Sequence, residues 1–253
     1  MFRKEILTIL AAVILLGVGQ TWAYVVFDTN GVIKDGDVYD YVYVRNDAVV
    51  DMTGGVVTHL LGAEDFSIVN VSGGLLGRLG CVDFSMLNLS GDMQTDELEV
   101  HDSGTLNLSG SMQADGVKIW GLGTLNMFGG IVGSVEIYSS NASANLYGGI
   151  ISEYLMDLST VKIYGYGFQY DPLAGDYRGG QLTGFWMNNT PFSIDLYYSD
   201  TPGGPLIDTY SHIVLIPEPA TFLLLGLGVL LQRKLKLTCK AVCGIMSSIG
   251  IIG

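Results

Sequence analysis

Val69-Asn70-Val71-Ser72-Gly73 begins a series of near-identical pentapeptides, which continues as Leu87-Asn88-Leu89-Ser90-Gly91, Leu106-Asn107-Leu108-Ser109-Gly110, Leu125-Asn126-Met127-Phe128-Gly129 and Ala144-Asn145-Leu146-Tyr147-Gly148. Weaker copies occupy residues 50–54 and 161–165. The glycines that end these copies are 19, 18, 19, 19, 19 and 17 residues apart. A fixed period of this length indicates a repeat architecture, because a unit so short cannot bury an apolar face unless copies stack on one another.

Each repeat contains a second stretch in which apolar and polar residues alternate, as in Leu98-Glu99-Val100, Val117-Lys118-Ile119 and Val135-Glu136-Ile137. Residues 82–84 and 156–158 follow it less regularly. This alternation is the period of a β-strand with one buried face. We therefore predict an all-β fold, a parallel β-solenoid of about seven coils over residues 24–165, with an 18–19-residue repeat and two or three short strands per coil. The repeat glycines are expected at the corners, where φ is positive.

Stacking at this period places one asparagine of each repeat above the next. Because the flanking leucines and valines point inward, the amides should point outward. Two interpretations follow: a ladder of amide hydrogen bonds that stiffens the stack, or a ligand-binding strip for carbohydrate. The asparagines concerned are Asn70, Asn88, Asn107, Asn126 and Asn145.

Residues 166–216 depart from the repeat, and we predict that they form a C-terminal β cap. A hairpin with its turn at residues 187–190, a loop over 201–205 and a last strand over 207–216 are expected. Two roles suit the aromatic residues of this segment, either a sugar-stacking platform or packing against the last coil. They are Tyr166, Tyr170, Tyr177, Phe185 and Trp186.

The first 23 residues have the composition of a secretory signal peptide. Arg3 and Lys4 form a positive n-region, residues 6–18 form an apolar h-region, and Thr21-Trp22-Ala23 supplies small residues at the −3 and −1 positions. We expect signal peptidase to cleave after Ala23. An uncleaved membrane anchor is the alternative, although the apolar core is shorter than the ~20 residues that a span needs.

The other end of the chain carries three successive features. Pro217-Glu218-Pro219-Ala220-Thr221 precedes an apolar run over residues 222–231, which a basic cluster of Arg233, Lys234 and Lys236 follows. The prolines end the preceding strand, a short apolar helix enters the bilayer, and the cations stay on the cytoplasmic side. Residues 1–23 and 217–236 are thus predicted as hydrophobic helices that flank the solenoid.

This tripartite pattern over residues 217–236 resembles the PEP-CTERM sorting signal of Gram-negative bacteria. The resemblance implies recognition by an exosortase, a membrane-embedded protease and transpeptidase that acts near the Pro-Glu-Pro, and association with exopolysaccharide or matrix. It implies a cell-envelope or extracellular location, with membrane contact through the C-terminal segment before processing. Residues 237–253 depart from the pattern, because such signals normally end soon after the basic cluster; a plain hydrophobic anchor is the alternative.

Charge and cysteine content exclude several classes of partner. Residues 24–232 contain 24 acidic and 6 basic residues, a net charge of −18. Such an acidic surface repels nucleic acid, so we expect no nucleic-acid partner. Cys81 is the one cysteine of this segment, so no disulfide can form within it. Cys239 and Cys243 fit no common zinc pattern, and we predict neither a metal site nor a cofactor.

An acidic cluster is the best candidate for catalysis in the sequence: Asp92, Asp96, Glu97, Glu99 and Asp102. Two of its carboxylates could lie within the ~5 to 9.5 Å that glycoside hydrolysis demands. The linkers between strands are too short to build the cleft that such enzymes use, so a solvated acidic face is the preferred interpretation. No catalytic residue is predicted.

Together these patterns predict an exported structural or adhesive protein of the cell envelope or matrix that is not an enzyme. Its expected partners are signal peptidase, exosortase and exopolysaccharide. Two alternatives are a carbohydrate-active enzyme of the β-helix type, either a lyase or a hydrolase, and a calcium-dependent adhesin favoured by the strongly acidic charge.

Overall fold

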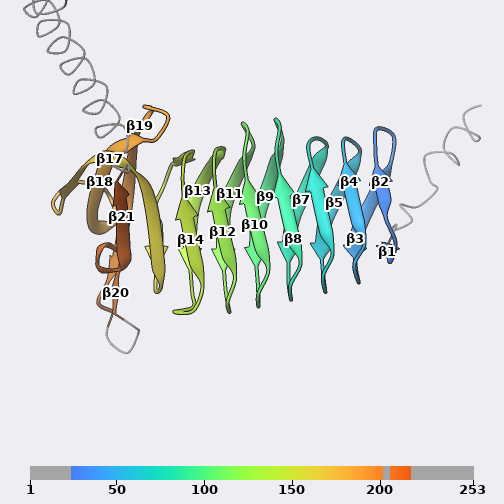
Figure 1. Cartoon of the computed structure of the whole chain (residues 1–253), viewed down its shortest axis with the longest axis horizontal. Helices are drawn as coiled ribbons and strands as arrows, with labels where there is room; N and C mark the ends of the chain where they lie inside the picture. Colours follow the sequence, from blue (N-terminus) through green and yellow to red (C-terminus); the bar gives the residue numbers. More distant parts are fainter. Residues whose placement is uncertain (1–23, 202–205, 218–253) are drawn as a thin grey trace, which may run out of the picture. The chain divides into compact units, whose positions relative to one another are not determined.

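The computed structural model describes residues 24–201 and 206–217, which form a parallel β-solenoid (Figure 1). The predicted all-β class, the stack of about seven coils and the spacing of about 19 residues are confirmed. Each regular coil contains two strands, one on either side of the stack. The predicted flanking helices lie outside the described residues. Within the described residues, no helix has the length and apolarity needed to cross a membrane.

The shorter strands form one sheet and come from the pentapeptide repeats. They are β2 (Gly31–Ile33), β4 (Val49–Met52), β6 (Ile68–Val71), β8 (Met86–Leu89), β10 (Thr105–Leu108), β12 (Thr124–Met127) and β14 (Ser143–Leu146). Each strand from β4 to β12 pairs in parallel with the equivalent strands of the coils before and after it, while β2 pairs with β4 alone among the described residues. One period of about 19 residues in the sequence therefore corresponds to one step from a strand to the next strand in the sheet.

The longer strands form the opposite sheet. They are β1 (Tyr24–Phe27), β3 (Val38–Val44), β5 (Val56–Ala63), β7 (Leu75–Cys81), β9 (Gln94–Val100), β11 (Gln113–Ile119) and β13 (Ile131–Ile137). In the next coil, β15 (Ile150–Ile151) and β16 (Leu155–Asp157) together pair with β13 and replace a single long strand. Residues 82–84, expected to continue the alternating strand, instead form a turn after β7.

The core lies between the two sheets and consists of aliphatic side chains stacked on their equivalents. Leu87, Leu106 and Leu125 are in register in the short-strand sheet. Leu98, Val117 and Val135 are in register in the long-strand sheet. All of them are fully or almost fully buried. At about 1.5–3 kcal/mol for each large aliphatic side chain removed from water, this repeated burial stabilises the stack.

The corner that follows each short strand requires a left-handed residue, but the repeat glycine supplies it only in some coils. Gly91 and Gly110 have φ of 85° and 74°, as predicted. Where two glycines follow the strand the second takes this conformation, as Gly55, Gly74, Gly130 and Gly149 do. The prediction was therefore wrong for Gly54, Gly73, Gly129 and Gly148, and also for Gly165, which lies within a strand, β17 (Thr160–Asp171). The first glycines of the pairs lie against the preceding coil: a Cβ on Gly148 would stand 2.6 Å from the backbone oxygen of Phe128.

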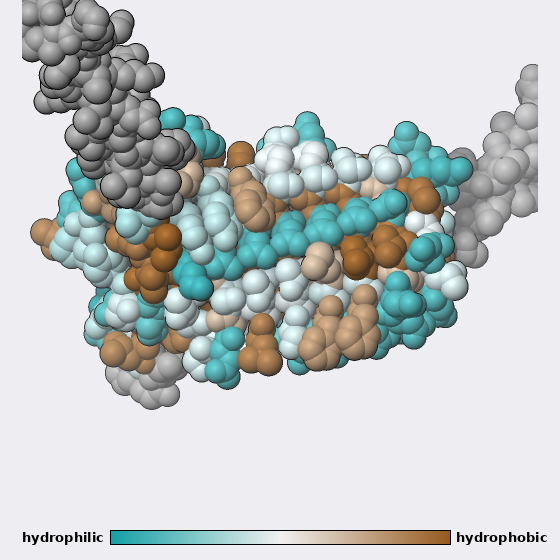
Figure 2. Space-filling view, in the orientation of Figure 1, coloured by the Kyte–Doolittle hydropathy of each residue, from teal (hydrophilic) through white to brown (hydrophobic). Residues whose placement is uncertain are grey.

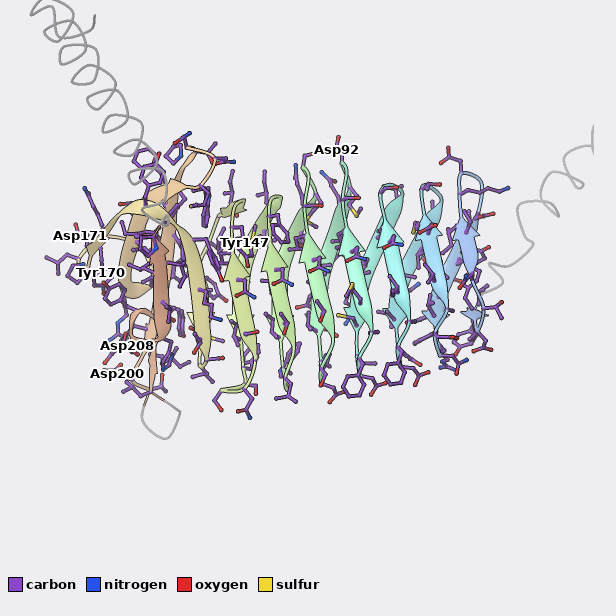
Figure 3. The ribbon with its side chains drawn as sticks, in the orientation of Figure 1. Asp92, Tyr147, Tyr170, Asp171, Asp200 and Asp208 are labelled. Carbon is purple, nitrogen blue, oxygen red and sulfur yellow. The ribbon has the colours of Figure 1, made fainter. Side chains whose placement is uncertain are left out.

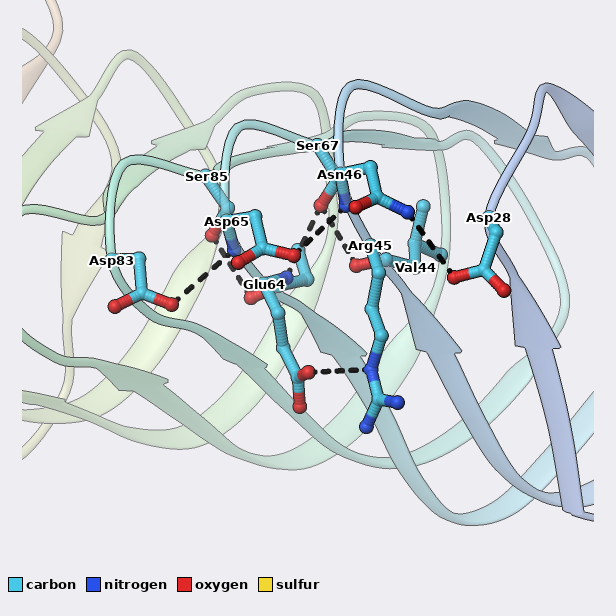
Figure 4. A network of polar contacts seen from close by, with 10 residues as sticks. Asp28, Val44, Arg45, Asn46, Glu64, Asp65, Ser67, Asp83 and Ser85 are labelled. Carbon is cyan, nitrogen blue, oxygen red and sulfur yellow. Dashed lines mark hydrogen bonds and ion pairs between the residues drawn. The ribbon is translucent and has the colours of Figure 1, made fainter.

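A second left-handed corner follows the long strands and is formed largely by Asn and Asp, which tolerate this conformation. Asn46, Asp65, Asp83 and Asp102 have φ between 51° and 60°, and Gly121 continues the series. The amide N–H of Asn46 donates to Asp65 Oδ2 at 2.9 Å, and that of Asp65 donates to Asp83 Oδ2 at 3.3 Å (Figure 4). Each carboxylate therefore accepts from the backbone of the coil before it.

The buried hydroxyls of this corner also connect successive coils. Ser67 Oγ donates to the Val44 carbonyl and Ser85 Oγ to the Ala63 carbonyl, both at 2.9 Å. An ion pair between Arg45 Nε and Glu64 Oε2 at 2.7 Å lies beside them (Figure 4). The corner is therefore a polar seam along the stack.

Beyond β16 the pairing of the strands becomes mixed. The strands of this region are β17 (Thr160–Asp171), β18 (Arg178–Trp186), β19 (Pro191–Ser199), β20 (Ile207–Asp208) and β21 (Ile213–Pro217), with the 3₁₀ helix η1 (Thr209–His212) between the last two. Strand β17 begins parallel to β14 and β19 touches β16 in parallel, while β17–β18, β18–β19 and β19–β20 pair antiparallel. The β18–β19 hairpin turns over residues 187–190, as predicted. The single strand expected over residues 207–216 is wrong, because η1 interrupts it.

Gly110 provides a direct test of the corner geometry. Its φ is 74°, and an added Cβ would stand 2.7 Å from the backbone nitrogen of Gly91. We expect Gly110→Ala to lower the free energy of unfolding by at least about 1–2 kcal/mol, the cost of a left-handed L-residue. Gly80→Ala is the control, because the nearest atom to its Cβ would be 3.8 Å away. Equal losses of stability for the two variants in urea denaturation would show that the corner does not require glycine at position 110.

Candidate functional site

The outward asparagines form a continuous hydrogen-bonded ladder on the short-strand sheet. The Nδ2 of each donates to the Oδ1 of the asparagine in the preceding coil, at 2.8 Å from Asn88 to Asn70, 2.7 Å from Asn107 to Asn88, 2.8 Å from Asn126 to Asn107 and 2.9 Å from Asn145 to Asn126. Asp51 Oδ1 accepts from Asn70 at 2.8 Å and ends the series. The amide ladder predicted from the sequence is confirmed.

Figure 2 shows a continuous hydrophilic stripe along the stack on the side of the short strands, where the ladder lies, with hydrophobic side chains bordering it in places. Toward its C-terminal end, aromatic rings replace the serines that follow the ladder. The ring centroid of Tyr147 lies 4.8 Å from that of Phe128 and 4.2 Å from that of Tyr164 (Figure 3 labels Tyr147). Tyr147 is stacked between the other two rings along the solenoid axis, so both of its faces are occupied, whereas Phe128 is 55% exposed.

An open groove of about 1070 Å³ runs along the first residues of the long strands. Several successive coils line it, most of them with three consecutive residues each. The middle position is buried and mostly apolar, as at Val57, Leu76 and Ala114. The position before it varies between coils. It carries aliphatic side chains at Leu75, which is 65% exposed, and Ile131, which is 37% exposed, and glutamines at Gln94 and Gln113. The groove therefore has a mostly apolar floor and one flank of mixed aliphatic and amide side chains.

The position after the floor forms the other flank, which is acidic in two adjacent coils and is small or polar in the others. Thr95 is opposite Ala114 and Glu97 is opposite Gly116 in the β9–β11 ladder, so Asp96 and Asp115 occupy the same place in adjacent coils. Glu153 lines the groove farther along. Coils separated by one strand spacing, ~4.8 Å, bring the two aspartates close together. This flank can accept hydrogen bonds from hydroxyl or ammonium groups.

A smaller hollow of about 360 Å³ adjoins the groove and shares Asp96 and Asp115 with it. Glu97 forms an ion pair with Lys118 within this hollow. Glu136 is almost buried and accepts hydrogen bonds from the Tyr138 hydroxyl, from Ser134 Oγ at 3.1 Å and from the Tyr154 hydroxyl at 2.7 Å. Burial alone would raise the pKa of Glu136, but these hydrogen bonds outweigh it and lower the pKa.

The five acidic residues singled out in the sequence do not form one site. Asp96 and Glu97 line the hollow. Asp92 lies on the loop after β8 (Figure 3), Glu99 is 3.6 Å from His101 Nε2, and Asp102 is a corner residue. Sequence reasoning missed Asp115 and Glu136, which join Asp96 and Glu97 instead. The 19-residue period was a signal for Asp115, which follows Asp96 by 19 positions.

The aromatic residues predicted as one platform take part in separate contacts. Trp186 is 3% exposed, packs on Phe192 and donates from Nε1 to the Gly149 carbonyl at 3.1 Å. Phe185 stacks on Tyr166. Tyr170 stacks on Tyr210, and Tyr177 lies against Tyr154. The packing interpretation therefore holds for Trp186, and the five residues do not form a single stacking surface.

One carboxylate is buried where the last coil meets η1. Asp157 is fully buried, and its Oδ2 has no hydrogen-bond partner among the described residues. Its Oδ1 accepts from the Ser159 amide, while its own amide donates to Thr209 Oγ1 at 3.2 Å. Burial raises the pKa of Asp157 from 3.8 to about 6, against the opposing effects of the Ser159 amide and His212.

No family model, curated protein or solved structure matches the chain. Of the predicted sorting residues, Pro217 ends β21, while Glu218, Pro219, Arg233, Lys234 and Lys236 lie outside the described residues, as does Ala23. Within residues 24–201 and 206–217, no group of three or more His, Cys, Asp and Glu side chains is arranged to hold a metal ion.

Removing one asparagine from the middle of the amide ladder should lower the free energy of unfolding. Asn107→Ala removes one bond to Asn88 and one from Asn126, so we expect a loss of about 1–2 kcal/mol in the free energy of unfolding. Asn141→Ala, at an exposed turn outside the ladder, is the matched control. Urea denaturation of the two variants measures the difference, and an equal effect would show that the ladder adds no stability.

Asp157 predicts a dependence of stability on pH. The folded protein keeps this carboxyl protonated up to about pH 6, whereas the unfolded chain releases the proton near 3.8, so stability is lost as pH rises through this window. We expect Asp157→Asn to raise the free energy of unfolding at pH 8 by up to about 3 kcal/mol and to change it little at pH 4. The control is Asp92→Asn, measured by urea denaturation at both pH values.

Proposed function

We propose that the chain is an exported, non-catalytic protein of the cell envelope or extracellular matrix, with a structural and adhesive role, and that an exosortase sorts it. The sorting part rests on the residues of the two termini and on their resemblance to the PEP-CTERM signal. The observation that carries the structural and adhesive part is the uninterrupted stack. It combines a hydrogen-bonded amide ladder with a groove that crosses several coils.

The adhesive ligand that suits the groove is an extended, hydroxyl-rich polymer such as an exopolysaccharide. The apolar floor at Leu76 and Ala114 suits the C–H face of a sugar, and the carboxylates of Asp96 and Asp115 can accept hydrogen bonds from its hydroxyls. The groove crosses successive coils at ~4.8 Å intervals, so a linear chain laid along it would contact several coils at once, with the paired carboxylates of Asp96 and Asp115 in the middle. Many weak contacts of this kind favour avidity for a polymer over affinity for a single sugar.

Two observations support a role other than hydrolysis. A general acid needs a carboxyl with a raised pKa at the reacting bond, whereas the pKa of Glu136 in the hollow is lowered. Asp157 has a raised pKa but is fully buried against η1.

We also propose that residues 166–216 act as the C-terminal cap. In support of this, β18 and β19 pair with β17 and β16 of the last coil, and Trp186 is buried.

The groove predicts selective loss of glycan binding. Neutralising Asp96 and Asp115 together as Asp96→Asn and Asp115→Asn should weaken binding to a responsive polysaccharide about tenfold or more, because hydrogen bonds to two charged acceptors are lost. The measurement is a glycan array followed by biolayer interferometry on purified residues 24–217. Asp92→Asn, on a loop away from the groove lining, is the control.

The same experiment separates the competing functions. Shortening of the polysaccharide during incubation, abolished by the double variant, would identify a carbohydrate-active enzyme instead. Binding that disappears in EDTA and returns with calcium would identify a calcium-dependent adhesin. Equal binding by wild type and the double variant would move the ligand away from the groove.

A further inference from the structure

The first coil of the solenoid has strand edges that the described chain leaves unpaired. β1 pairs with β3 and β2 pairs with β4, each on one side. Among residues 24–201 and 206–217 no strand pairs with the opposite side of either. An unpaired strand edge is a ready template for another strand, and natural proteins normally cover or disrupt it.

The direction of the backbone groups identifies which residues form this edge. The Phe27 carbonyl accepts from the Arg45 amide at 3.0 Å, and the Ile33 carbonyl accepts from the Thr53 amide at 3.0 Å. Both carbonyls therefore face the second coil. Backbone groups of successive strand residues face opposite sides, so the N–H and C=O of Tyr24, Val26 and Val32 face outward, away from the stack.

The outward edge is also partly apolar. The side chains of Tyr24 and Val32 are 56% and 57% exposed, and Val26 is half-buried. The other end of the stack differs, because β16 and β17 of the last coil already pair with β19 and β18. The N-terminal end of the described stack therefore presents two unpaired strand edges, those of β1 and β2, whereas the strands of the last coil at the C-terminal end are paired.

A partner for this edge must present two strand edges at the separation of the two sheets. A second copy of the same coil does so when it is related by a two-fold axis perpendicular to both the strands and the stack. We infer that the chain forms a dimer through its first coils, with β1 antiparallel to β1 and β2 antiparallel to β2 of the second copy. Such a contact is self-complementary and closed, so it yields dimers and not fibres.

The residues that make this contact follow from the outward groups. Only outward-facing residues can exchange both backbone bonds in an antiparallel pair, so Tyr24 and Val26 of β1 pair with outward-facing residues of the second β1, and Val32 pairs with Val32 of the second β2. If signal peptidase cleaves after Ala23, the mature chain begins at the first residue of β1. The inference is independent of the glycan ligand proposed above.

Proline at the outward positions tests the contact. Among the described residues the buried core lies between Ile33 and Leu196, so a protein of residues 24–217 keeps all of it. The double variant Val26→Pro and Val32→Pro removes two outward N–H donors that the described fold does not use, a position where an edge strand tolerates proline. The matched control, Val26→Thr with Val32→Thr, keeps both donors and the branched side-chain shape.

Light scattering across a concentration series gives the mass. We expect wild type and the threonine variant to approach twice the chain mass and the proline variant to stay at one, with unchanged circular dichroism. Hydrogen exchange gives a second readout: the Val26 and Val32 amides should become protected as wild-type concentration rises, whereas Val25 should be protected throughout. A monomeric wild type with unprotected Val26 and Val32 amides, or a folded proline variant that keeps the dimer mass, would overturn the inference.

Discussion

Parallel backbone pairing between equivalent residues of successive coils is the constraint on which the rest of this structure depends. Each side chain therefore lies on the equivalent side chain of the next repeat, one strand spacing away. A residue type that recurs at such a position must interact favourably with another copy of itself. Leucine satisfies this in the core by packing, and asparagine satisfies it on the surface because one amide both donates and accepts. Stacking of like on like therefore explains both the core and the ladder.

Carboxylates fit this rule poorly, because they accept hydrogen bonds but cannot donate them when ionised. At the Asn/Asp corner the chain avoids a contact between like charges: the carboxylate of Asp65 accepts from the Asn46 amide, and that of Asp83 from the Asp65 amide. In the groove, Asp96 and Asp115 instead share one position in adjacent coils. Carboxylates in adjacent coils can accept hydrogen bonds from a ligand, whereas the ladder amides already bond one another, and this is the basis for proposing the groove and not the ladder as the ligand site.

Identical coils could continue to add to the end of the stack, so a different structure has to cover the last coil. At the C-terminal end the chain changes to antiparallel pairing, and Trp186 and Leu196 become part of the core. This change has a cost, because Asp157 is enclosed between the last coil and η1 with one oxygen unpartnered among the described residues. The N-terminal end keeps the geometry of an ordinary coil, which is the basis for pairing with a second copy.

The sequence by itself determined the period, the parallel solenoid, the inward leucines, the outward asparagines and the hairpin turn at residues 187–190, because all of these follow from local alternation and from spacing along the chain. Tertiary structure decided which glycine of a pair is left-handed and that Asp83 forms a corner instead of a strand. It also decided that Asp96 and Glu97 meet Asp115 and Glu136, and not Asp92 or Asp102. The physical reason is that a period fixes the step along the stack, whereas the bends within a coil, set by close backbone contacts between coils, fix which side chains face one another.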